Sequence, residues 1–176
     1  MDIKTIFILS FCCLILFGSL LHFTHDWIKK GVLLHIFSAL NESTWEHMKL
    51  LVAPTILIGI LQYIFLKESY TNLFNSIFIL LLVEVTSIPL LFEPLRLLLK
   101  KVPFSVTILI FILSILFGLL TQSYFLKENI YLFPEEVALL LSLGIVGIFA
   151  IFSYYPPKIF LFKDPITGKY GDVKEH

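Results

Sequence analysis

Hydrophobic residues occur along the chain in five long runs, which short polar segments separate. Together with the helical residues that lead into it, each run is long enough to cross about 30 Å of hydrocarbon as an α-helix. The first run does not end in the small residues of a signal-peptide cleavage site, so we interpret it as a retained span. The pattern predicts an all-α, polytopic five-transmembrane-helix bundle with spans at 3–23, 50–66, 72–92, 104–126 and 134–155.

Glycine, proline and polar residues predict where these helices end and how they pack. The segment 28–40 is too short and too often interrupted to span, so we expect it at the membrane interface or packed under the helices. Pro89 and Pro94 are expected to disturb the end of the third span. Gly144 and Gly147 are expected to give the fifth span a surface for close helix approach.

The composition agrees with this pattern. The 176-residue chain is 58% hydrophobic and 15% charged, with a mean hydropathy of +0.93, whereas soluble domains are about 25% charged. Acidic and basic residues are equal in number, and the resulting zero net charge argues against nucleic acid as a partner. Cys12 and Cys13 are adjacent within an apolar run, so they form neither a disulfide framework nor a spaced metal motif.

One polar motif, Asn-Glu-Ser-Thr-Trp-Glu-His-Met-Lys at 41–49, stands out between apolar segments. Asn41 is a suitable N-cap for the second long helix, and Ser43 with Glu46 three residues later is an equally suitable capping box. Capping therefore accounts for these three residues, but it accounts poorly for Trp45 and His47. The motif residues that we retain as functional-site candidates are Asn41, Glu42, Trp45, Glu46 and His47.

A second polar cluster follows the first span. His22, His25 and Asp26 are spaced so that all three share one face of a helix. This spacing suits metal ligation or proton exchange, but it also suits a hydrated helix terminus, where histidine is favoured near the negative end of the helix dipole. With His47 added, the cluster gives a hypothetical site for a divalent metal.

One carboxyl group falls near the middle of a span, far from both ends. Glu84 lies near the middle of the third span, where a carboxylate costs several kcal/mol unless it is neutral or has a partner. Acidic residues at this depth commonly mark ion or proton pathways. Glu84 is therefore a functional-site candidate.

The residues after the fifth span are expected to be ordered. Aromatic residues alternate with lysines, which is typical of a segment that lies along the membrane interface. Asp164-Pro165 and Thr167-Gly168 are turn signals, and Asp164 is the last functional-site candidate. We therefore divide the chain into a five-span domain, 1–155, and a cytoplasmic tail, 156–176.

The basic residues are distributed unevenly between the two predicted sides of the membrane. Lys4, Lys67 and Lys127 fall on one side, and the other ten of the 13 basic residues fall on the opposite side. The positive-inside rule places the second set in the cytoplasm. The N-terminus is then outside, and the 22–26 cluster, the 41–49 motif and the tail meet on the cytoplasmic face.

Three motifs carry a resemblance to a known family. The 41–49 motif, Leu-His-Phe before it at 21–23, and Tyr-Tyr-Pro-Pro with Phe-Lys-Asp-Pro-Ile-Thr-Gly-Lys-Tyr-Gly after it (154–157 and 162–171) resemble those of bacterial integral membrane proteins of unknown function. These proteins occur mainly in Gram-positive anaerobes. The resemblance implies a location in the bacterial cytoplasmic membrane, and it carries over no activity and no catalytic residue.

Three functions are consistent with these patterns. The first is a membrane component that binds a protein partner or a lipid at its cytoplasmic face. The second is a small transporter that uses Glu84. The third is a metal-dependent hydrolase within the membrane, with ligands drawn from His22, His25, Asp26, Glu46 and His47, although their spacing matches no standard zinc signature.

Overall fold

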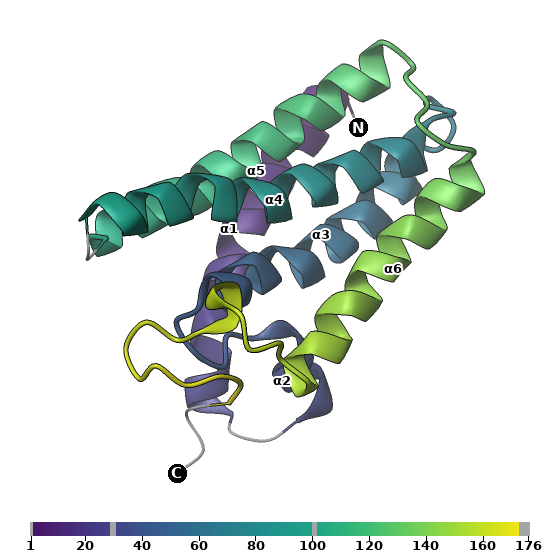
Figure 1. Cartoon of the computed structure of the whole chain (residues 1–176). Coiled ribbons are helices and arrows are strands. Elements are labelled where there is room, and N and C mark those ends of the chain that lie inside the picture. The colour runs from purple at the N-terminus through teal and green to yellow at the C-terminus, as the bar shows by residue number, and fades with distance from the viewer. Residues whose placement is uncertain (1, 29–30, 100–101, 173–176) are drawn as a thin grey trace.

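Six α-helices account for most of the chain (Figure 1). The computed structural model describes residues 2–28, 31–99 and 102–172, and the side chains of residues 25 and 26 also lie outside the description. Five of the helices are long and apolar enough to cross a membrane, which confirms the predicted all-α, five-span architecture. The elements are α1 (Ile3–Trp27), α2 (Val32–Phe37), α3 (Thr44–Leu66), α4 (Leu73–Leu99), α5 (Phe104–Lys127), α6 (Glu135–Tyr154) and the 3₁₀ turn η1 (Phe160–Phe162).

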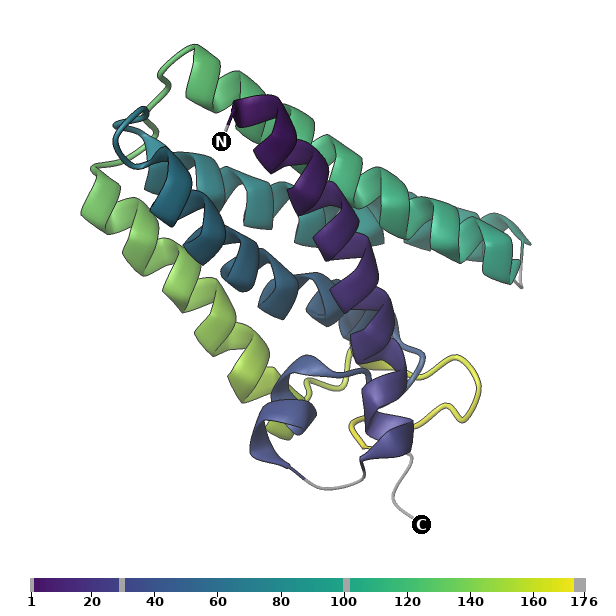
Figure 2. The same cartoon turned by 180° about the vertical axis from the view of Figure 1, so that it is seen from behind.

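The long helices pack around α3 and α4. Helix α1 packs against α3 and α5, and α6 packs against α4 (Figures 1 and 2). The short α2 and the tail with η1 gather at one end of the bundle, beside the start of α3 and the end of α6. Within its described residues, the 28–40 segment contains one six-residue helix, which packs under the others as its length predicted.

The outward-facing surface is apolar, and polar groups are collected between the helices. Ile8, Leu57 and Leu90 are more than half exposed on α1, α3 and α4, as is appropriate for side chains that face lipid. Between the helices, Gln62 of α3 donates hydrogen bonds to Ser10 of α1 (3.2 Å) and to Gln122 of α5 (3.1 Å). Such bonds hold membrane helices together because hydrocarbon offers these groups no other partner.

The third long helix does not end where the sequence predicted. Helix α4 passes through Pro89 and Pro94 and reaches Leu99. A proline inside a helix removes its own N–H donor and crowds the carbonyl group four residues before it, but the last turns of α4 keep other attachments. Glu93 forms an ion pair with Arg96 (2.6 Å) and accepts a hydrogen bond from Thr44 of α3 (2.5 Å). The expectation of a disturbed end was therefore wrong.

The close helix contacts occur at different glycines from those predicted. A Cβ atom added at Gly144 or Gly147 would meet nothing within 4 Å, so these glycines do not support close approach of α6. A Cβ atom added at Gly118 of α5 would lie 2.7 Å from Glu84 Cγ. One added at Gly18 of α1 would lie 2.5 Å from Phe111 Cζ. The tight crossings therefore involve α5, which packs between α1 and α4, whereas these two glycines of α6 face open space.

Candidate functional site

The first residues of the 41–49 motif start α3 and hold the tail. Ser43 is the N-cap, and its hydroxyl accepts a hydrogen bond from the Glu46 N–H (3.4 Å). Asn41 is not the N-cap of this helix. Its Oδ1 accepts from the Ser43 N–H (2.7 Å), and its Nδ2 donates to the Gly171 carbonyl of the tail (2.8 Å). Asn41 therefore connects the start of α3 to the end of the chain.

Glu46 and Lys49 form a buried ion pair inside this end of the bundle. Lys49 Nζ lies 2.6 Å from Glu46 Oε2, and the lysine is fully buried. Lys49 also donates to the His35 carbonyl (3.1 Å) and to Ser153 Oγ (3.3 Å), while Glu46 accepts from the Leu40 N–H (3.0 Å). The pair thus ties α3 to α2 and α6. Lys49 was not among the candidates, because a single lysine near a helix start usually reaches water.

Trp45 belongs to an aromatic stack that joins α3, α6 and the tail. Its ring centroid lies 4.2 Å from that of Phe149 and 4.4 Å from that of Phe162. Phe162 of η1 is buried in this stack, whereas Tyr155 at the end of α6 is 78% exposed. Trp45 Nε1 has no hydrogen-bond partner among the described residues. The stack accounts for the indole as a packing group.

Asp164 organises the turn that the Asp164-Pro165 and Thr167-Gly168 pairs predicted. Its carboxylate accepts hydrogen bonds from the Ile166 N–H (3.0 Å) and from the Thr167 hydroxyl (2.6 Å). Its backbone N–H and carbonyl pair with Lys169 and Gly168, and Gly168 has the positive φ of 71° that favours glycine. The contacts of Asp164 are therefore those of a turn residue.

The remaining motif residues, Glu42 and His47, face His22 of α1. His47 Nε2 lies 3.7 Å from Glu42 Oε2, His22 Nε2 lies 4.0 Å from Glu42 Oε1, and the two imidazole centroids are 5.7 Å apart. We had expected Glu46 in this group, and that was wrong. Residues 46 and 47 point about 100° apart on a helix, so only His47 turns toward α1 while Glu46 turns toward Lys49.

The hydrogen bond at the other nitrogen of His47 determines which groups this cluster offers. His47 Nδ1 lies 2.9 Å from the Ser43 carbonyl oxygen. A carbonyl only accepts, so Nδ1 carries a proton, and Nε2 of the neutral ring is an acceptor. Nε2 and the Glu42 carboxylate then present two acceptors toward each other at 3.7 Å. This is longer than a direct hydrogen bond, and a donor placed between them could bond to both.

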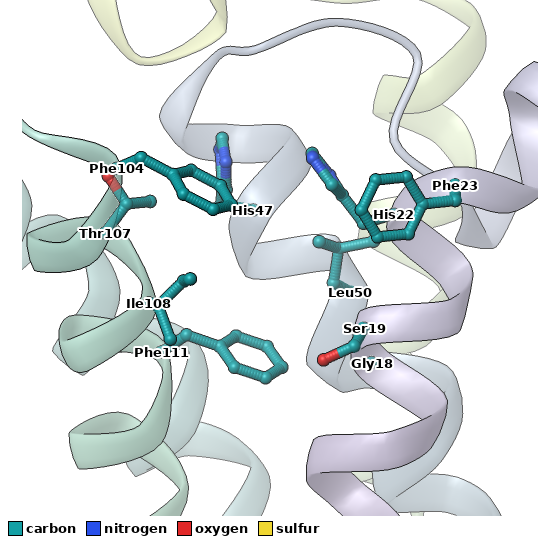
Figure 3. A pocket seen from close by; sticks show the side chains of 10 residues that line it. All are labelled: Gly18, Ser19, His22, Phe23, His47, Leu50, Phe104, Thr107, Ile108 and Phe111. Atoms are coloured by element: carbon teal, nitrogen blue, oxygen red, sulfur yellow. The ribbon is translucent and has the colours of Figure 1, made fainter.

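His22 and His47 line the polar end of a cavity between α1, α3 and α5, and the Glu42 carboxylate lies beside them. The cavity has a volume of about 180 Å³. Figure 3 shows His22 and His47 side by side at one end, with the α5 side chains across from those of α1. A smaller cavity toward α4 shares His47, Thr107 and Phe111 with it. The lining residues are Gly18, Ser19, His22, Phe23, His47, Leu50, Phe104, Thr107, Ile108 and Phe111.

Most of this lining was not predicted from the sequence. Aromatic and aliphatic residues of α5 such as Phe104, Ile108 and Phe111 have no local signal that distinguishes them from lipid-facing residues. Phe104 is 70% exposed and Ile108 is 43% exposed, so the cavity opens sideways to the surface that lipid would cover. Only the polar end, His22 and His47, could be recognised beforehand.

The proposed metal ligands come together only in part. The structure places His22 beside His47, while the side chains of His25 and Asp26 lie outside the described residues. Among the side chains that are described, no group of three or more His, Cys, Asp or Glu is arranged to hold a metal ion. The described part of the cluster is thus a set of hydrogen-bonding groups.

Glu84 is separate from this cluster. It is fully buried between α3, α4 and α5, and it accepts a hydrogen bond from the Thr55 hydroxyl (2.5 Å). Its other carboxyl oxygen has no hydrogen-bond partner among the described residues. Glu84 does not line either of the two cavities described above.

Five long apolar helices, with buried polar bonds between them and a side-opening cavity, have the character of a multi-pass membrane protein. The chain belongs to DUF6512, a family of unknown function, whose family model matches residues 1–172. No curated protein and no solved structure matches the chain. The family match agrees with the sequence resemblance in assigning no activity.

Proposed function

We propose that this protein is a multi-pass protein of a bacterial cytoplasmic membrane that binds an amphiphile from the bilayer. The apolar part of the ligand occupies the cavity between α1, α3 and α5, and its head group meets His22, Glu42 and His47. The observation that carries the proposal is the position of His22 and His47 at one end of a mainly apolar cavity, with the Glu42 carboxylate beside both of them. Ligand sites commonly combine apolar walls with a few placed polar groups.

The chemistry of the polar end favours a head group that donates hydrogen bonds. His47 Nε2 and the Glu42 carboxylate are acceptors 3.7 Å apart. A hydroxyl or ammonium group between them satisfies both, whereas a head group that is only an acceptor faces repulsion from Glu42. The exposed Phe104 and Ile108 give an apolar entrance from the lipid side.

The orientation of the protein is part of the same proposal. The cavity head-group site and the tail lie at the same end of the bundle. In the topology predicted from the sequence, ten of the 13 basic residues fall on this side of the membrane. The positive-inside rule places this end in the cytoplasm. The ligand would therefore come from the cytoplasmic leaflet.

A photoactivatable diacylglycerol, which carries a free hydroxyl, tests the proposal. In detergent-solubilised protein we expect it to cross-link to residues 18–23 and 104–111, as mapped by mass spectrometry. Ser19→Trp fills the cavity and should abolish this labelling, whereas Leu16→Trp, on the exposed face of the same helix, should not. Labelling that is spread over the outer surface, or that Ser19→Trp leaves unchanged, contradicts the proposal.

The head-group contacts have their own test. Glu42→Gln and His47→Gln should each weaken diacylglycerol binding about tenfold, because a hydrogen bond to a charged or buried group is lost. A phosphatidylcholine probe with the same chains has no donor in its head group, so its weaker binding should not change. If both probes lose affinity equally, the substitutions act on the cavity shape and not on head-group recognition.

The same protein preparations separate this function from the metal-dependent hydrolase. Elemental analysis of wild-type protein purified without chelator should show no stoichiometric metal. If metal is present, His47→Gln should abolish it while the protein remains monodisperse, and the hydrolase function would then replace the present proposal.

A further inference from the structure

A second groove lies between α1 and α5, at the opposite end of the bundle from the cavity. Its volume is about 500 Å³, within the range of about 300–1,000 Å³ that is typical of ligand pockets. Figure 2 shows the N-terminal half of α1 beside the C-terminal half of α5, where the groove runs. Its lining residues are Ile3, Lys4, Phe7, Ile8, Phe11, Leu116, Leu119, Leu120, Ser123 and Lys127.

The groove has one basic end and an apolar remainder. Lys4 is in the first turn of α1 and Lys127 is in the last turn of α5, and both line the groove. Both lysines are exposed, and Asp2 lies near enough to Lys4 to interact with it electrostatically. The nearby Asp2 accepts a hydrogen bond from the Thr5 N–H (3.1 Å) as the N-cap of α1 and does not line the groove. The lining thus offers two positive charges and no carboxylate.

The length of the groove fits one leaflet of a bilayer. From Lys4 to Phe11 the helix rises about 10 Å, and from Lys127 to Leu116 it rises about 16 Å. The hydrocarbon core of a bilayer is about 30 Å thick, so one leaflet accounts for about 15 Å. The lysines lie at the ends of their spans, where the lipid phosphates are located. The apolar walls then reach as deep as the acyl chains of that leaflet.

We infer that this groove is a binding site for an anionic phospholipid of the surrounding bilayer. One acyl chain lies along Phe7, Phe11 and Leu120, and the lipid phosphate is held between the Lys4 and Lys127 ammonium groups. Charge complementarity selects the lipid. A zwitterionic lipid places a compensating positive charge beside its phosphate, whereas phosphatidylglycerol does not, so only the anionic lipid gains from both lysines.

Native mass spectrometry of the intact protein with phosphatidylglycerol or phosphatidylcholine of identical chains tests this inference. Wild-type protein should bind phosphatidylglycerol more tightly, and the double variant Lys4→Ala/Lys127→Ala should lose about 30-fold in its affinity, with phosphatidylcholine binding unchanged. The matched control is Lys67→Ala. Lys67 is a basic residue at the same end of the bundle, but its ammonium group lies over the Tyr63 ring (5.4 Å) and not in the groove.

A bulky substitution in the wall provides the second variant. Ser123→Trp obstructs the groove without changing its charge, and it should weaken the binding of both lipids. Thermal unfolding of each variant verifies that the fold is kept. Three results would overturn the inference: equal affinity of wild-type protein for the two lipids, unchanged binding in the double variant, or an equal loss in Lys67→Ala. The last result would indicate a general charge effect at this end of the bundle.

Discussion

At the scale of single residues, the conspicuous polar motif serves two purposes that its sequence does not separate. Glu46 and Lys49 are buried in a salt bridge that also bonds to the His35 carbonyl of α2 and to the Leu40 N–H after it. His47 turns the other way, to the cavity, with Glu42 beside it. A buried ion pair is retained at a cost in desolvation, and removing one partner leaves the other charge uncompensated. The first pair is therefore expected to determine stability, and the second to determine binding.

Lys49→Met tests the role of the buried pair. Because Glu46 would remain buried without its partner, we expect the free energy of unfolding to fall by about 3–5 kcal/mol. The double variant Glu46→Leu/Lys49→Met should recover part of this loss, since it removes both charges together. Thermal or denaturant unfolding of the solubilised protein measures the effect. The exposed Lys67→Met should change stability by about 0.5 kcal/mol or less, and an equally small effect at Lys49 would contradict the buried pair.

At the scale of elements, close packing is concentrated where α5 meets its neighbours. Gly118 lets α5 approach α4 so closely that an added Cβ would lie 2.7 Å from Glu84 Cγ and 3.2 Å from the Leu80 carbonyl oxygen. The second of these is a backbone atom, which cannot move aside as a side chain does. Helix α6 has two glycines of its own, but they face open space. Glycine at position 118 therefore permits the close contact of α5 with α4, whereas the two glycines of α6 make no such contact.

A pair of glycine-to-alanine substitutions tests this difference. Gly118→Ala should lower the free energy of unfolding by about 1–3 kcal/mol, as overpacking does. Gly144→Ala should be neutral or raise stability by up to about 1 kcal/mol, because alanine has the higher helix propensity. Both are measured by thermal unfolding in the same detergent. Equal effects of the two substitutions would mean that α4 and α5 are not in close contact at Gly118.

At the scale of the whole molecule, the two ends of the bundle differ in charge and in the segments that gather there. One end gathers α2, the tail and the head-group cluster, and the other carries few basic residues, among them Lys4 and Lys127 of the α1–α5 groove. This asymmetry supports the proposed orientation, with the N-terminus outside and the tail in the cytoplasm. It also assigns the two proposed lipid sites to opposite leaflets.

Cysteine labelling in intact cells tests this orientation. In a background without Cys12 and Cys13, a cysteine at Lys29 or Asp172 should react with a membrane-impermeant maleimide only after the cells are permeabilised. A cysteine at Glu128, between α5 and α6, should react in intact cells. Efficient labelling at positions 29 and 172 from outside would reverse the orientation and exchange the leaflets of the two sites.

Features that depend on local sequence were predictable. The five spans follow from the length of apolar runs, because each helix must satisfy its own backbone hydrogen bonds in hydrocarbon. The N-cap at Ser43 and the turn at Asp164 depend on hydrogen bonds between residues two or three positions apart. The sequence by itself therefore determined the all-α architecture, the start of α3 and the turn in the tail.

The partners of each polar side chain were decided only by the tertiary structure. The helical period separates the directions of Glu46 and His47, but it does not state that the first meets the Leu40 N–H and the buried Lys49 while the second meets His22 of α1. The burial of Lys49, the close contact at Gly118 and the α5 wall of the cavity depend likewise on which helices become neighbours. That choice is made by packing between residues far apart in the chain, which no local pattern records.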